Sequence, residues 1–203
     1  MKNKLLIATH NKAKLEYFSK LLTSFDLELL SLNDFKISSV VEENGLDETE
    51  NALIKARYYA KLSGVASFAD DAGMYIPALG NMPGVQVRRW AGRFSDEIGD
   101  REWLDFFLDQ MKQVNDKDRK GYFKISRAIV TSDGSEHVMR WSREFKVLDT
   151  PNWSLYKEGW PMSAVTIDTA LGKSFMDLSE EEKLMYEGDN LLEFDQIFKK
   201  IYK

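Results

Sequence analysis

Hydrophobic residues in the first part of the chain follow two different spacings, which predict alternating strands and helices. Short apolar runs predict three buried strands, at residues 4–9, 27–30 and 65–69. Between these runs, apolar residues recur at helical spacing over about residues 11–25 and 49–63. Asn11 is a suitable N-cap for the first of these helices, and Gly64 is a suitable end for the second. The predicted order is β-α-β-α-β.

The pattern then changes to one that predicts a long hairpin and further helices. Prolines and glycines make residues 77–84 irregular. Helical spacing predicts two more helices, over about residues 99–114 and 191–201. Alternating stretches predict the two strands of the hairpin, at residues 123–129 and 141–147. Ser132-Asp133-Gly134 forms its turn, and residues 179–182 form a helix capping box. We therefore predict an α/β fold with a mixed sheet.

The composition narrows the class of protein. With 203 residues, 43% of them hydrophobic, the chain can bury the core of one generous domain or of two small lobes. It has 28 basic and 33 acidic residues, a net charge of −5, which argues against nucleic acid as a partner. With no cysteine and two histidines, a metal would be a hard cation on carboxylates. The apolar run near the N-terminus is too short for a membrane span, so we expect a cytoplasmic protein without a membrane partner.

The first candidate site is the turn Thr9-His10-Asn11-Lys12-Ala13-Lys14, which joins a predicted strand to a predicted helix. Free amides and the positive end of the helix dipole favour a phosphate there, and the two lysines add full charges. The turn lacks the glycines of a Walker A loop. Taken alone, it is more simply explained as an ordinary capped helix with solvated lysines.

The second candidate is Asp70-Asp71, which we expect at the carboxyl end of the third strand. Carboxylates at such a position commonly hold Mg²⁺, which needs only one or two of them besides water and substrate oxygens. A tight turn before Gly73 explains the pair equally well. Glu42 or Glu43 would complete a metal pair beside Asp71, although a solvated acidic loop explains them more simply.

A further pair, Asn51 and Lys55, lies four residues apart and hence on one face of the helix over residues 49–63. Each of these signals is weak alone. A phosphate-type turn, an acidic pair at a strand end and a lysine on the helix between them together describe a site for Mg²⁺ and a nucleotide.

Five segments also resemble the inosine triphosphate pyrophosphatase family, which acts on non-canonical purine nucleotides. They follow the family's order, at residues 5–14, 50–57, 69–74, 79–84 and 89–92. The resemblance implies a single two-lobed domain over residues 1–203, a long mixed β-sheet flanked by helices with a central cleft for the nucleotide, and a homodimer. It also implies Mg²⁺-dependent hydrolysis of a nucleoside triphosphate to the monophosphate and pyrophosphate.

The resemblance further implies roles for individual residues. Glu42 and Asp71 would hold Mg²⁺, and Asp71 would accept the proton of the attacking water, with Asp70 as its acidic neighbour. Lys55 would reach the phosphates. The other predicted contacts with the substrate around this centre are Thr9, His10, Asn11, Lys14, Asn51 and Ala72. At two of these positions the chain departs from the family, which has Gly in place of His10 and a hydroxyl residue in place of Ala72.

A larger departure lies downstream, where family members carry Phe-Gly-Tyr-Asp-Pro and then Ser-His-Arg to recognise the purine. Trp160 stands near the family's Phe and could stack on a base, but Ser163 replaces the Asp. Gly188-Asp189 replaces the His-Arg pair, so we expect hydrogen-bonded recognition of the 6-oxo group to be lost. Lys173 and Lys183 keep the places of similar family residues and complete the predicted substrate site.

Three hypotheses follow: a pyrophosphatase for another nucleotide, a promiscuous pyrophosphatase, and a non-catalytic nucleotide-binding protein or sensor derived from this fold. The retention of Lys14, Glu42, Lys55 and Asp71 favours catalysis, because a protein that only binds has no need for all four. We therefore predict a pyrophosphatase whose base specificity differs from inosine and xanthosine.

Overall fold

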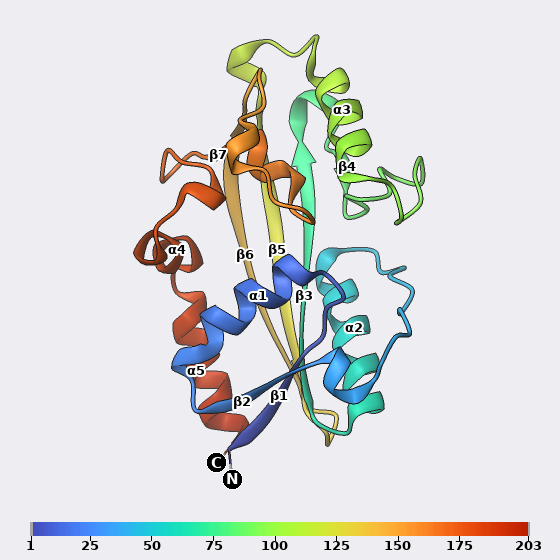
Figure 1. Ribbon diagram of the computed structural model, residues 1–203, viewed down its shortest axis with the longest axis vertical. Coiled ribbons are helices and arrows are strands. Elements are labelled where there is room, and N and C mark those ends of the chain that lie inside the picture. Colours follow the sequence, from blue (N-terminus) through green and yellow to red (C-terminus); the bar gives the residue numbers. More distant parts are fainter. Residues whose placement is uncertain (1, 203) are drawn as a thin grey trace. The chain divides into compact units, whose positions relative to one another are not determined.

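A mixed β-sheet is the framework of the protein, whose computed structural model describes residues 2–202 (Figure 1). Hydrogen-bonded neighbours follow the order β2-β1-β3-β5-β6-β7, and β4 pairs with β3 outside this path. The strands are β1 (Asn3–Ile7), β2 (Leu27–Ser31), β3 (Ala66–Ile76), β4 (Met82–Gly84), β5 (Lys120–Val130), β6 (Glu136–Val147) and β7 (Thr166–Asp168). The helices are α1 (Lys12–Leu21), α2 (Glu48–Ser63), α3 (Asp100–Met111), α4 (Glu180–Glu187) and α5 (Asn190–Ile201). Strand β1 is parallel to β2 and β3, whereas β4 and β7 are antiparallel to their neighbours.

The chain divides into two units, each with its own apolar core. The first unit consists of Met1–Asp71, Ile125–Trp141 and Asp189–Lys203. The second consists of Ala72–Lys124 and Ser142–Gly188. The long strands β3, β5 and β6 therefore contribute residues to both units.

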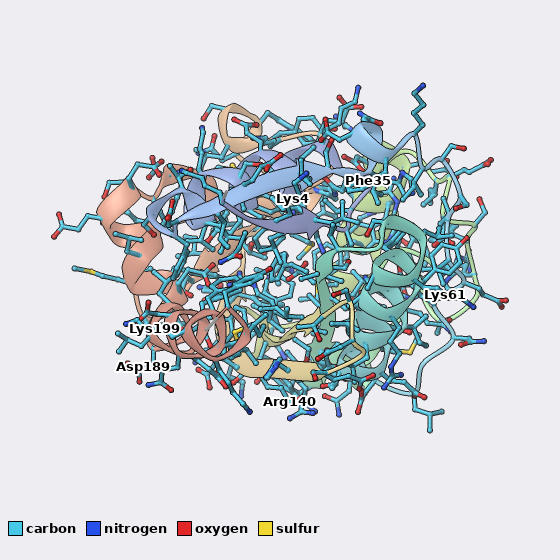
Figure 2. The ribbon with its side chains drawn as sticks, turned by 90° about the horizontal axis from the view of Figure 1, so that it is seen from below. Lys4, Phe35, Lys61, Arg140, Asp189 and Lys199 are labelled. Atoms are coloured by element: carbon cyan, nitrogen blue, oxygen red, sulfur yellow. The ribbon has the colours of Figure 1, made fainter. Side chains whose placement is uncertain are left out.

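Side chains of β1 alternate between two apolar clusters in the first unit, as the geometry of a strand requires. Leu5 packs in one cluster with Phe18 of α1 and Phe194 of α5. Leu6 packs in the other cluster with Ala56 of α2. Helices α1 and α5 thus cover one face of the sheet and α2 covers the other, and Figure 2 shows α5 and α2 on opposite sides of the strands.

The core of the second unit is built around α3. Trp103 and Phe107 of this helix are almost fully buried and pack in one cluster with Met74 and Ile76 of β3 and Phe145 of β6. Within residues 2–202, no helix has the length and apolar character that a membrane span requires.

Most predicted elements are confirmed. Asn11 caps α1, and Gly64 ends α2 with a φ of 72°, a conformation that glycine adopts easily. The predicted hairpin is β5 and β6, and Ser179 begins α4 with a capping box. The spacing of apolar residues, together with recognisable cap residues, is sufficient to predict these elements.

One predicted boundary is wrong, and it concerns the acidic pair. The third strand does not end at residue 69, because β3 continues to Ile76. It continues because it gains a second partner: residues 66–68 pair with β1, and residues 74–76 pair with β4. Asp70 and Asp71 therefore lie within a strand, which excludes the tight-turn explanation.

Candidate active site

The candidate site begins where β1 ends. Ile7 lies opposite Phe68 of β3, and the Ala8 N–H donates to the Phe68 carbonyl at 2.8 Å. Strand β3 runs on, so Asp70 and Asp71 extend past the end of β1. Because side chains alternate along a strand, Asp70 follows Phe68 onto the face of α1, and Asp71 lies on the face of α2. The two acids are thus placed beside different helices.

The turn between β1 and α1 is fixed by its own hydrogen bonds. The Asn11 Oδ1 atom accepts from the N–H groups of Ala13 and Lys14, at 2.9 and 3.1 Å. The Thr9 hydroxyl oxygen accepts from the Asn11 N–H at 3.1 Å. Asn11 therefore already satisfies two of the amides that were expected to bind a phosphate. The charges of the exposed Lys12 and the half-buried Lys14 remain to attract an anion to this turn.

The α1 cluster consists of Lys14, Asp70 and Arg127. Lys14 Nζ donates to Asp70 Oδ1 at 2.5 Å, and Arg127 Nε lies 3.9 Å from Asp70 Oδ2. The Asp70 side chain is only 8% exposed. Burial by itself raises the pKa of Asp70, but the charges of Lys14 and Arg127 outweigh burial and hold the pKa below its usual range. Asp70 is therefore a stable carboxylate with two cationic partners.

The α2 cluster consists of Lys55, Asp71, Glu43 and Asn51. Lys55 Nζ donates to Asp71 Oδ1 at 2.7 Å and to Glu43 Oε2 at 2.9 Å, and Asn51 Nδ2 donates weakly to Asp71 Oδ2 at 3.5 Å. Burial lowers the pKa of Lys55, but the two carboxylates outweigh burial and raise it. Burial raises the pKa of Asp71; Lys55 opposes this rise, Glu43 adds to it, and the net pKa is raised. Two acids here share one lysine.

The acidic loop before α2, which contains Glu43 and Gly45, is held close to the helix because its backbone N–H groups donate to side chains of α2. The Gly45 N–H donates to Asn51 Oδ1 at 2.8 Å, and the Leu46 N–H donates to Glu50 Oε2 at 2.7 Å. A Cβ atom on Gly45 would lie 2.7 Å from Asn51 Oδ1 and 2.9 Å from the Asn51 backbone nitrogen. Glycine is therefore required for this approach, which brings Glu43 to Lys55. Glu42, the predicted metal ligand, is exposed.

The α2 cluster has donors that suit Mg²⁺. Within residues 2–202, no three acidic or histidine side chains gather into a complete metal site. Mg²⁺ needs only one or two protein carboxylates when a substrate's phosphate oxygens supply other ligands. Asp71 and Glu43 offer carboxylate oxygens, and their excess negative charge would be offset by a divalent cation. The residues present therefore fit a magnesium ion that binds together with a polyphosphate.

Sequence comparison identifies the family of this chain. A model of the Ham1 family matches residues 5–187. The chain belongs to the Ham1 family. The resemblance to the inosine triphosphate pyrophosphatases, which the sequence motifs indicated, is confirmed.

Two relatives of this Ham1 family protein share the same enzyme name. The dITP/XTP pyrophosphatase of Thermus thermophilus is 32% identical over 183 residues, which cover 90% of this chain and 84% of the relative. That of Mycobacteroides abscessus is 39% identical over 143 residues, 68% of each chain. The predicted enzyme class, a nucleoside triphosphate pyrophosphatase, is confirmed for the family to which the chain belongs.

Solved structures confirm the predicted α/β fold. The crystal structure of a nucleoside-triphosphatase / dITP/XTP pyrophosphatase from Mycobacterium abscessus is 32% identical, with a TM-score of 0.67 over 94% of this chain and 98% of that one. The structure of a HAM1 protein from Coxiella burnetii reaches a TM-score of 0.76 over 98% of this chain and 99% of that one. At 24% identity the second likeness concerns the fold alone.

Two further predicted substrate contacts, His10 and Ala72, belong to neither ionic cluster. His10 is exposed, and its Nε2 atom lies 3.1 Å from both the Ser39 carbonyl oxygen and the Tyr59 hydroxyl. It thus joins the turn after β1 to the segment before α2. Ala72 is half-buried in β3, next to Asp71. Contact of either residue with a substrate stays a prediction.

The predicted residues downstream belong to the second unit and contact neighbours there. Trp160 is half-buried, with its ring edge-on to Phe175 at a centroid distance of 5.0 Å. Lys173 pairs with Glu182 at 2.6 Å, and Lys183 pairs with Glu180 at 2.8 Å.

Ser163, which replaces the family's aspartate, lies in the same unit and is buried. Its hydroxyl donates to the carbonyl oxygens of Leu155 and Trp160, at 2.6 and 2.8 Å. These bonds fix the conformation of the segment, so the serine has a structural function in the fold as it stands.

Two residues of the ionic clusters were absent from the roles that the family resemblance implies. Glu43 stood only as the alternative to Glu42 for a metal pair with Asp71, because sequence spacing does not tell which of two adjacent acids points toward the helix. Arg127 could be recognised from the sequence, since it lies between Ile125 and Ile129 at a position of the alternating strand that is otherwise apolar. A charged residue at such a position is the signal that could have identified it.

The close approach of Gly45 to α2 generates a prediction. In a Gly45→Ala variant, the new methyl group must push the loop from Asn51, which breaks the Gly45 hydrogen bond and withdraws Glu43 from Lys55. We expect amide hydrogen exchange over residues 43–47 to rise by about tenfold or more, since exchange reports local opening. Gly99→Ala is the matched control, because space around Gly99 is open and its φ is −64°. Unchanged exchange in the loop of Gly45→Ala would show that glycine is not needed there.

Proposed function

We propose that this protein is a magnesium-dependent nucleoside triphosphate pyrophosphatase that acts through the α1 and α2 clusters. The observation that carries the proposal is the pairing of two lysines, Lys14 and Lys55, with two neighbouring aspartates of β3. Such an arrangement supplies both cations for a polyphosphate and carboxylates for a metal ion and a proton. It lies in a chain whose curated relatives are dITP/XTP pyrophosphatases.

Each cluster has its own part in the proposed reaction. Lys14 and Lys55 bind phosphate oxygens, with Thr9 and Asn11 shaping the turn that holds Lys14. A water molecule attacks the α-phosphorus, the new P–O bond forms, and the bond to the pyrophosphate leaving group breaks. Asp71 accepts the proton that this water loses; its raised pKa makes it a stronger base than an ordinary aspartate.

The metal would be held by Asp71 together with Glu42, as the family resemblance implies, or with Glu43, which lies beside Lys55. Bound there, Mg²⁺ supplies Lewis-acid polarisation of the phosphoryl oxygens. Lys55 would then leave its carboxylates for phosphate. Every buried charge would keep an opposite partner during this exchange, so binding would not strand a charge in the protein.

A protein that only binds nucleotides is a weaker explanation. A buried lysine shared by two acids is costly to maintain, because taking all three charges out of water carries a large desolvation penalty. Asn51 and Gly45 also act to bring a second carboxylate toward Lys55. A pair of carboxylates that share one lysine suits a metal ion and a proton acceptor better than it suits simple anion binding.

We further propose that the base specificity differs from that of the relatives. Ser163 stands where the family has an acid, and its hydroxyl already bonds to two carbonyl oxygens. Gly188-Asp189 stands where the family has His-Arg, so a donor for a 6-oxo group is replaced by an acceptor. Trp160 keeps an aromatic surface on which any base could stack. A homodimer stays a proposal that rests on the family resemblance, and a cytoplasmic location stays a proposal that rests on the sequence alone.

The proton-accepting role of Asp71 is tested by Asp71→Asn. We expect pyrophosphate release to fall by about 100-fold or more, because general-base catalysis is lost while the amide keeps the size of the side chain. Asp105→Asn is the control, since Asp105 is exposed and pairs with Arg101 one helical turn away. Turnover that is equal in the two variants would remove Asp71 from the reaction.

The proposed specificity is tested by a panel of nucleotides. Pyrophosphate release is measured for dITP, XTP and the canonical nucleoside triphosphates, with Mg²⁺ and with EDTA. We expect activity that requires the metal and a best substrate other than dITP or XTP. A strong preference for dITP or XTP would contradict the altered specificity. Thermal stabilisation by nucleotides without any pyrophosphate release would instead support the non-catalytic alternative.

A further inference from the structure

We propose that Arg127 is a positioning residue that allows Lys14 to leave Asp70 and bind the substrate's phosphates; this inference rests on the proposed function. Arg127 lies in β5 with a side chain only 3% exposed, and its Nε lies 3.9 Å from Asp70 Oδ2. Lys14 Nζ occupies the other oxygen, Oδ1, and its side chain is 25% exposed. One partner of Asp70 is thus buried and the other can reach solvent.

Aromatic rings hold the Arg127 guanidinium in place. Its Cζ atom lies 4.4 Å from the ring centre of Trp141, 4.9 Å from that of Phe18 and 5.7 Å from that of Phe194. These rings come from β6, α1 and α5, so the guanidinium is enclosed by three elements of the first unit. Cation–π attraction compensates in part for its burial. Arg127 is consequently fixed beside Asp70 and is too deeply buried to bind a substrate itself.

The fixed position of Arg127 makes it easier for Lys14 to leave Asp70. To bind a phosphate, Lys14 must give up the Asp70 carboxylate, which is itself 8% exposed. A buried carboxylate left without a cation is strongly unfavourable, so a lone Lys14–Asp70 pair would hold the lysine back. Arg127 stays with Asp70 when Lys14 leaves, and therefore lowers the cost of the exchange.

In the α2 cluster, a different feature would keep a cation beside the buried carboxylate when its lysine leaves. Asp71 shares Lys55 with a second acid, Glu43, rather than gaining a second cation. There a divalent ion would replace the lysine beside the carboxylates. The α1 cluster needs no metal for this purpose, because Arg127 is a permanent part of the chain. A purely structural role for Arg127 would instead consist of its contacts with the rings.

The test measures binding of inorganic tripolyphosphate with Mg²⁺ by calorimetry, in the wild-type protein and in Arg127→Met. We expect Kd to rise by about tenfold or more in the variant. KM for the nucleotide should rise similarly, with kcat changed by less than about threefold, because Lys14 binds the ground state and the transition state alike. Arg127→Lys keeps the positive charge and should restore most of the affinity.

Two further variants separate positioning from packing. Phe194→Leu disturbs the same aromatic surroundings without removing a charge, and should leave Kd within about twofold even where it lowers the unfolding temperature. Arg127→Met combined with Asp70→Asn removes the stranded carboxylate and should bind tripolyphosphate more tightly than Arg127→Met alone. The double variant also has no unpaired buried charge, so it provides a folded protein where Arg127→Met is unstable.

Three results would overturn the inference: an unchanged Kd in Arg127→Met, an equal loss of affinity in Phe194→Leu, or no recovery in the double variant. These differ from failure of the proposed function, in which the wild-type protein itself would not bind tripolyphosphate and both proposals would fall. Binding by the wild type with an equal Kd in Arg127→Met would reject the positioning role alone.

Discussion

The alternation of side chains along β3 places two adjacent aspartates beside two different helices, and the rest of the candidate site depends on this constraint. Asp70 meets Lys14 of α1, and Asp71 meets Lys55 of α2. Both contacts become possible because β1 stops at Ile7 while β3 continues. Parallel pairing of these two strands thus creates an open end with one acid and one lysine on each face of the sheet.

Taken together, the α1 and α2 clusters carry equal numbers of positive and negative side chains without a ligand. This balance determines which ligands the site can accept. Three carboxylates, Asp70, Asp71 and Glu43, lie against three cations, Lys14, Lys55 and Arg127. A polyphosphate with a divalent ion brings both signs of charge at once, so partners can be exchanged without leaving a buried charge alone. The two acids differ in what surrounds them: Asp70 has two cations and a lowered pKa, whereas Asp71 faces a second acid and has a raised pKa. The same strand therefore carries one carboxylate suited to holding a lysine and one suited to accepting a proton.

Much of this arrangement follows from the sequence because local patterns determine it. The cap at Asn11 and the glycine that ends α2 are local signals, and the structure confirms both. Asn51 and Lys55, which share a face of α2, both contact the predicted Asp71. The length of β3 was mispredicted, since a second pairing partner far along the chain extends the strand through the aspartates. The choice between Glu42 and Glu43 stayed open for a related reason: the loop's path depends on a contact between Gly45 and α2 that no periodicity reveals. Arg127 shows that a charge in an apolar register of a strand is informative even when its partners are distant in sequence.

A structure of the protein with Mg²⁺ and a non-hydrolysable nucleoside triphosphate analogue would show directly which groups the two lysines bind. We predict that the Nζ atoms of Lys14 and Lys55 move from their carboxylates to phosphate oxygens, that Asp71 binds the metal, and that Arg127 remains on Asp70. A bound nucleotide that leaves Lys14 on Asp70 and Lys55 on Asp71, with its phosphates elsewhere, would contradict this prediction.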